Sequence, residues 1–209
     1  YVDVGFSLDE IAAARKLFGV LMSMLGIGLG GWMVARFGLM RSLIVGAVLQ
    51  PLSNIAFSAL IFTGPWVPGL WACIALDNIS AGIAGTALIA YMSSLTSLGF
   101  TATQYALFSS LYALPGKLLA AVSGRIVEGG IASAAAGEGG FRGWFTGIAP
   151  DSFARLSAER SIPAEAFAAG YMTFFIYSGV IGIGALVFAI AVMRQAPPKA
   201  EAPQADAPA

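Results

Sequence analysis

The sequence predicts an all-α membrane protein, a bundle of about five transmembrane helices. Of its 209 residues, 58% are hydrophobic and only 11% are charged, whereas a soluble domain carries roughly 25% charged residues. A helix needs roughly 20 mostly apolar residues to cross the hydrocarbon core, where its backbone polar groups can be satisfied only within the helix. Five segments meet this requirement: residues 11–35, 42–63, 67–95, 103–127 and 166–193.

The first span has a well-defined start and a small-residue face. Ser7 and Glu10 form an S-x-x-E pattern, which predicts a capping box. Gly26 and Gly30 form a G-x-x-x-G pattern, which lets two helices approach closely. The same stretch also fits the G-x-G-x-x-G pattern of dinucleotide sites, but no strand precedes it, so no cofactor is expected.

The second and third spans carry polar residues at membrane depth. In the second span, Pro51 lies between Gln50 and Asn54 and cannot donate a backbone hydrogen bond. The third span contains Asp77 followed by Asn78. Interrupted helices with polar residues are typical of transporter binding sites. We therefore expect these four polar residues to belong to a solute or proton pathway. Kinks that only shape helix packing are the alternative.

The fourth span carries a cation behind a helix-loosening pair. Pro115 and Gly116 immediately precede Lys117, and together they are expected to leave backbone carbonyls free in this span. Lys117 is therefore a further candidate for the solute or proton pathway.

Two stretches are not expected to span the membrane. Residues 128–165 predict a long loop because Gly129 and Gly130 oppose a helix at its start, and a short amphipathic surface helix is expected within 151–160. The tail 196–209 holds four prolines among alanines and predicts disorder. The bundle itself is expected to fill residues 1–195.

Three ionisable residues stand out inside the predicted spans, where a charge costs several kcal/mol unless it is paired or faces water. A rise of ~1.5 Å per residue places Lys16, Asp77 and Lys117 in the same half of the membrane. An Asp77–Lys117 ion pair that joins two helices is one interpretation, and a solute or proton site is the other. The residues alone leave both open.

The composition excludes several classes of function. The chain has 11 basic and 11 acidic residues, so no nucleic-acid partner is expected. It has no histidine, which removes the commonest general base and a favoured metal ligand. Its single cysteine, Cys73, lies among apolar residues and is expected to be an inert packing residue. Neither a catalytic site nor a metal site is predicted, so the chain is not expected to be an enzyme.

The orientation is predicted from the basic residues that flank the spans. The short turn after the first span holds Arg36 and Arg41 without an acid, and the tail begins with Arg194 and Lys199. The long loop on the opposite face carries Arg142, Arg155 and Arg160. Because short basic turns favour the cytoplasm, we expect the C terminus there.

The turn between the first two spans resembles a known signature. Residues 31–41 read G-W-M-V-A-R-F-G-L-M-R and are similar to the G-x-x-x-D-R-x-G cytoplasmic loop, followed by basic residues, of the major facilitator superfamily. The matching residues are Gly31, Arg36, Gly38 and Arg41. Ala35 stands where the signature has Asp, so the charge latch usually assigned to that loop is not expected here.

Three longer stretches resemble the AmpG muropeptide permease family within that superfamily. They are residues 5–19, which include Lys16, then 77–82, which read D-N-I-S-A-G, and 100–107, which read F-T-A-T-Q-Y-A-L. The resemblance covers residues 1–128 well and the last span loosely.

The resemblance implies a function and a place in a larger protein. The five spans would be helices eight to twelve of a twelve-helix transporter in the bacterial inner membrane, and seven preceding helices would lie outside this chain. The family imports anhydro-muropeptides together with protons for cell-wall recycling. The expected partners are therefore the lipid bilayer, a muropeptide-like solute, protons and the missing N-terminal half.

Two alternatives stay open at this point. The same branch of the superfamily includes acetyl-CoA carriers, so the solute could be another large anion. In a different class, the chain would be a structural membrane subunit or receptor in which the buried charges only hold helices together.

Overall fold

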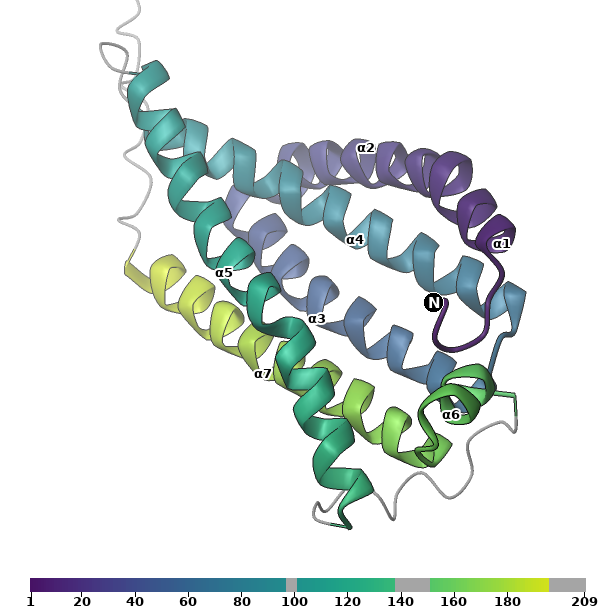
Figure 1. Ribbon diagram of the computed structural model, residues 1–209. Coiled ribbons are helices and arrows are strands. Elements are labelled where there is room, and N and C mark those ends of the chain that lie inside the picture. The colour runs from purple at the N-terminus through teal and green to yellow at the C-terminus, as the bar shows by residue number, and fades with distance from the viewer. Residues whose placement is uncertain (97–100, 138–150, 196–209) are drawn as a thin grey trace, which may run out of the picture.

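The computed structural model describes residues 1–96, 101–137 and 151–195, and these ranges contain helices and no strand. The elements are α1 (Leu8–Ala13), the π-helix η1 (Ala14–Phe18), α2 (Gly19–Phe37), α3 (Leu39–Thr63), α4 (Val67–Ser94), α5 (Thr101–Ala135), α6 (Ala154–Arg160) and α7 (Ala164–Gln195). Within the described ranges, five helices are long and apolar enough to cross a membrane, the first being the continuous run Leu8–Phe37. The predicted all-α membrane bundle is confirmed (Figure 1).

The predicted capping box starts the first span. The Ser7 hydroxyl accepts a hydrogen bond from the Glu10 backbone N–H at 3.3 Å, and the Ser7 backbone N–H donates to the Glu10 carboxylate at 2.8 Å. Two of the donors that a helix start leaves unpaired are satisfied in this way. The helix then widens into η1, whose five residues include Lys16, before it continues as α2.

A single residue connects α2 to α3. Gly38 has a φ of 85°, where a side chain would be strained, and its N–H donates to the carbonyl of Val34. Its carbonyl accepts hydrogen bonds from both the backbone N–H and the hydroxyl of Ser42. The two spans are therefore longer than expected at this turn, because the turn uses one glycine rather than residues 36–41.

The helices form a row in the order α2, α4, α3, α7, α5, in which each packs against the next. Figure 1 shows that the row folds back, so that the end of α4 and the start of α5 lie close together while the two helices diverge at their other ends. Residues of α3, α4, α5 and α7 line a common groove.

Each of the four packed pairs meets at a glycine. A side chain at these positions would collide with backbone atoms of the neighbouring helix or, at Gly182, with the ring of Pro51, so each pair of helices is in close contact. The contacts are Gly26 on Ile79 for α2 and α4, Gly46 on Ala84 for α3 and α4, Gly182 on Pro51 for α3 and α7, and Gly130 on Gly170 for α5 and α7. Gly26 and Gly30 both face α4, whereas Gly28 and Gly31 face open space, so the predicted role of the G-x-x-x-G pair is confirmed.

Three expectations about helix breaks are wrong. Helix α5 continues to Ala135 through Gly129 and Gly130, because Gly130 packs closely on Gly170 of α7 and the contact compensates for poor helix propensity. Helix α3 is continuous through Pro51, whose ring packs against Gly182. Helix α5 is likewise continuous at residues 115–117.

The remaining loop is partly structured. Helix α6 lies within 151–160, where a short surface helix is expected, and α7 begins at Ala164, slightly before the predicted residue 166. Residues 138–150 of the predicted loop and the predicted disordered tail 196–209 lie outside the described residues.

Most of the buried apolar side chains form two clusters at one end of the bundle. One cluster joins the end of α3, the end of α5 and the start of α7, and contains Phe153 and Phe167. A second joins Phe6, before α1, to the end of α3 and the start of α4, including Leu70. The bundle is closely packed at this end, which we call the closed end. The opposite end carries the Gly38 turn.

Candidate functional site

Asp77 lies within α4 and is held by two side chains of α3. Its Oδ1 accepts hydrogen bonds from the Ser53 hydroxyl at 3.0 Å and from the Gln50 side-chain amide at 3.3 Å. Ser53 is fully buried and Asp77 is half-buried. Hydrogen bonds from these neutral donors lower the cost of a carboxylate at membrane depth.

A groove of about 860 Å³ lies between α3, α4, α5 and α7. Its lining is mostly apolar but includes amide and hydroxyl groups from all four helices. These polar lining residues are Gln50, Asn54, Tyr91, Tyr112, Ser123, Tyr177 and Ser178. Its size and its few polar groups within an apolar wall are typical of small-molecule sites.

Gln50 connects the two features. It lines the groove and also donates to Asp77, whereas Asp77 is not among the residues that line the groove. One turn of α3 thus presents Gln50 and Asn54 to the groove and Ser53 to the half-buried carboxylate. Gln50, Asn54 and Asp77 were predicted to share one pathway. In the structure, Gln50 bonds to Asp77 and lines the groove together with Asn54.

The two candidate lysines are not part of this arrangement. Lys16 in η1 and Lys117 in α5 are both exposed, and neither is among the groove-lining residues. Within the described ranges, the ion pairs are Arg155–Glu159 and Arg160–Glu128, so the Asp77–Lys117 pair considered from the sequence is not formed.

Asn78 has a packing contact rather than a groove contact. Its side-chain carbonyl accepts a hydrogen bond from the Ser23 hydroxyl of α2 at 2.8 Å, and its amide donates to the carbonyl of Ile74 at 2.8 Å. The bond to Ser23 fixes α2 against α4, whereas the bond to Ile74 stays within α4; the Asn78 side chain lies close to Gly19 of the first span. Asn78 therefore joins two helices and is not among the residues that line the groove.

The signature residues lie at the turn opposite the closed end. Gly38 forms the turn, and Arg36 lies 5.9 Å from the ring of Phe37. Arg41 is exposed in the first turn of α3, and Gly31 faces open space. Both arginines are thus free to meet solvent or lipid headgroups at this face.

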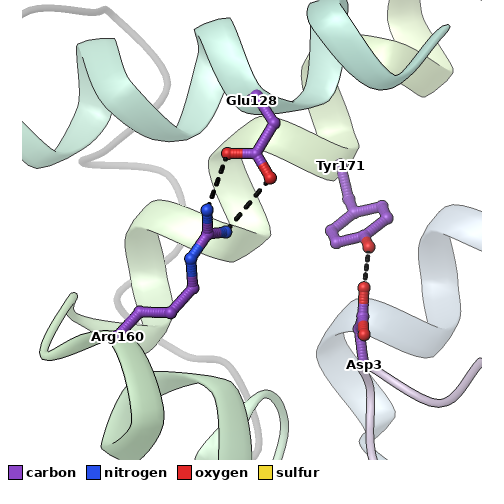
Figure 2. A network of polar contacts seen from close by, with 4 residues as sticks. All are labelled: Asp3, Glu128, Arg160 and Tyr171. Atoms are coloured by element: carbon purple, nitrogen blue, oxygen red, sulfur yellow. Dashed lines mark hydrogen bonds and ion pairs between the residues drawn. The ribbon is translucent and has the colours of Figure 1, made fainter.

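A polar network at the closed end was not predicted (Figure 2). Arg160 of α6 donates two hydrogen bonds of 3.1 Å to the Glu128 carboxylate of α5. These bonds raise the pKa of the Arg160 guanidinium above its ordinary value. The Tyr171 hydroxyl of α7 donates to the Asp3 carboxylate. Because these partners lie 32 and 168 residues apart, no local spacing signals the contacts.

The groove tyrosines were also missed by sequence reasoning. Tyr91, Tyr112 and Tyr177 stand on three different helices, and each lies within a mostly apolar run. A tyrosine is amphipathic and is common in spans near the interface, so the sequence pattern gives no reason to select these three. In the described ranges, no three His, Cys, Asp or Glu residues lie close enough together to hold a metal ion.

Comparison with known proteins identifies similar membrane transporters. The chain is 36% identical over 124 residues to putative transporter AmpG 3 of Rickettsia typhi, a match that covers 59% of this chain and 30% of that protein. It is 32% identical over 128 residues to putative transporter AmpG 4 of Rickettsia conorii, covering 61% and 31%. The anhydromuropeptide permease of Escherichia coli K12 is 31% identical over 125 residues, covering 60% and 26%.

These matches confirm the resemblance to AmpG permeases over about 60% of the chain. The matched part spans less than a third of each relative's length. No family model matches the chain, and no solved structure matches it.

Proposed function

We propose that this chain is the C-terminal part of a secondary transporter that imports anhydro-muropeptides and protons across the bacterial inner membrane for cell-wall recycling. The observation that carries the proposal is the groove with amide and hydroxyl groups at membrane depth, beside a hydrogen-bonded carboxylate. The similarity to proteins named as AmpG transporters and as an anhydromuropeptide permease supports the solute. Because the match covers 26–31% of those relatives, the activity is proposed for the whole transporter.

The groove is the proposed contact surface for the solute. A muropeptide carries sugar hydroxyls and peptide groups, which match the amides of Gln50 and Asn54 and the hydroxyls of Tyr91, Tyr112 and Tyr177. Aromatic faces also suit sugar rings, because a ring can pack on them while its hydroxyls reach polar neighbours. The missing N-terminal half would provide the other wall.

The proposed orientation has the Gly38 turn and the C terminus in the cytoplasm. Arg36 and Arg41 flank this turn, which favours the cytoplasmic side. The buried clusters then close the periplasmic end, and the groove residues lie nearer the Gly38 turn, from Leu43 to Asn54 on α3. This arrangement corresponds to a conformation in which the solute path leads to the cytoplasm.

Asp77 is the proposed proton-binding carboxylate. It is held by Gln50 and Ser53 without a fixed cation, so it can gain and lose a proton without breaking an ion pair. In the full-length transporter, Asp77→Asn should abolish proton-driven uptake of radiolabelled anhydro-muropeptide into vesicles while expression stays normal. Undiminished uptake would remove this role. Asn78→Ala is the matched control, because it changes the adjacent residue without touching the groove.

The exposed lysines are proposed to serve an anionic solute. Lys16 and Lys117 lie in spanning helices and have no acidic partner within the described ranges. A cation at this depth needs water or an anion. Lys117→Gln should therefore weaken uptake, and normal uptake would exclude Lys117 as a ligand. Competition between anhydro-muropeptide and an acyl-CoA distinguishes the proposed solute from another large anion.

A further inference from the structure

The hydroxyl of Ser53 has two acceptors and one proton. Its Oγ lies 2.8 Å from the backbone carbonyl oxygen of Gln50 and 3.0 Å from Oδ1 of Asp77. A hydroxyl can donate only one full hydrogen bond, although its oxygen can also accept. The position of this proton must therefore depend on whether Asp77 carries a proton of its own.

The two protonation states give two hydrogen-bond arrangements. When Asp77 is ionised, its carboxylate accepts from the Ser53 hydroxyl and from the Gln50 amide. When Asp77 gains a proton, its O–H can donate to the Ser53 oxygen, and the Ser53 hydroxyl then donates to the Gln50 carbonyl. The distances from Ser53 Oγ to Asp77 and to the Gln50 carbonyl fit both arrangements. In the second, the Gln50 amide has lost a charged acceptor, and hydrogen bonds to neutral acceptors are roughly half as strong.

We propose that Gln50 links the protonation of Asp77 to solute binding in the groove. Gln50 is the described residue that both bonds to Asp77 and lines the groove. Protonation releases its side-chain amide, which then donates to a carbonyl or hydroxyl oxygen of the solute. Loss of the proton draws the amide back to the carboxylate. Gln50 is thus a positioning residue for coupling, an inference that rests on the proposed function.

The titratable neighbour of Asp77 stays neutral when Asp77 gains or loses a proton. The Tyr1 phenol interacts electrostatically with Asp77, and Arg15 of η1 stacks on the Tyr1 ring at 5.9 Å. Burial raises the pKa of Tyr1, so it stays neutral when Asp77 changes state. The other titratable groups on elements that pack against α4, and on α4 itself, are Lys16, Arg36, Arg41, Cys73, Tyr91, Tyr105, Tyr112, Lys117, Arg125 and Glu128.

The test measures solute affinity against pH in the purified full-length transporter. Radiolabelled anhydro-muropeptide should bind the unmodified protein about tenfold more tightly at acidic than at alkaline pH. Gln50→Met keeps the side-chain volume but has no amide, and it should bind weakly with the same affinity at both pH values. Asp77→Asn should also lose the pH dependence. Asn54→Ala, which changes a groove amide that does not bond to Asp77, should bind more weakly but keep the tenfold ratio.

The possible outcomes separate this inference from the proposed function. If Gln50→Met keeps the tenfold ratio while Asp77→Asn loses it, Asp77 is the proton site and the link through Gln50 is wrong. If Asp77→Asn keeps the ratio, both the proton site and the link are wrong. If the unmodified transporter does not bind the muropeptide, the proposed function itself fails. Protection of Cys73 from a thiol reagent shows that each variant is folded, because this side chain is buried.

Discussion

Gly26 provides a direct test of how the first and third spans pack. A Cβ atom at this position would lie 2.5 Å from the carbonyl oxygen of Ile79 and 2.8 Å from its Cα. Both are backbone atoms, so no side-chain rotation can relieve the collision. The reciprocal position agrees, because a Cβ on Gly82 would lie 2.7 Å from the carbonyl carbon of Gly26. Gly26→Ala must therefore push α2 away from α4.

The size of the effect follows from a comparison with a second glycine of the same helix. Carbon atoms in contact are about 3.5–4.0 Å apart, so the helices must separate by about 1 Å. Overpacking of this kind costs about 1–3 kcal/mol. Gly28 has no atom within 4 Å of its Cβ position, so Gly28→Ala changes only helix propensity. Because both variants share the propensity gain of about 1 kcal/mol, their difference isolates the collision, and Gly26→Ala should be the less stable by about 1–3 kcal/mol.

The single cysteine makes the assay simple. Cys73 is 7% exposed and its thiol donates to the carbonyl of Ala56, so a thiol-reactive dye should label it only on unfolding. Thermal unfolding in detergent, followed by labelling of Cys73, should give Gly26→Ala a midpoint several degrees below that of Gly28→Ala. Equal midpoints would refute backbone contact between α2 and α4 at this position.

Three further predictions concern other contacts. Phe153 is fully buried and its ring stacks on those of Phe167 and Tyr171, so Phe153→Ala should lower the free energy of unfolding by about 3–5 kcal/mol. Trypsin should then cut within residues 154–160 faster, and an unchanged cleavage rate would contradict the packing of α6 on the bundle. Gly38 has a φ of 85°, and Gly38→Ala should cost about 1–2 kcal/mol of unfolding free energy; an unshifted thermal midpoint would count against the one-residue turn. Asn78→Ala removes the bond to Ser23 and should cost about 0.6 kcal/mol, measured by the same thermal assay, and leave the pH profile of uptake unchanged. An altered profile would return Asn78 to the transport pathway.

The sequence was sufficient for features that depend on neighbours along the chain. The five spans follow from segment length and hydropathy, and the Ser7–Glu10 box follows from a three-residue spacing. The helix-forming behaviour of Gly130 and Pro51 was not predictable, because it depends on Gly170 and Gly182, which belong to another helix. A residue that weakens an isolated helix can thus stabilise a packed pair.

The candidate site was also only partly predictable from the sequence. Asp77 could be selected because a charge at membrane depth requires a reason. Its actual partners, Gln50 and Ser53, depend on how α3 and α4 cross at Gly46, which the sequence does not specify. Depth along the membrane normal is one coordinate, and it cannot distinguish residues on facing sides of a bundle. For that reason Lys117 was grouped with Asp77 although the two form no ion pair.

The π-helix η1 gives the first span one residue more than a regular α-helix needs. Deleting a residue from an ordinary turn rotates everything after it by about 100°, which would carry Gly26 away from α4. A deletion within Ala14–Phe18 can instead be absorbed when the wide turn becomes an α-turn, because a π-turn closes one residue later. Lys16 stands in the middle of this segment and is exposed. A protein that lacks Lys16 should therefore fold with the same helix contacts, and its first span would carry one cation fewer.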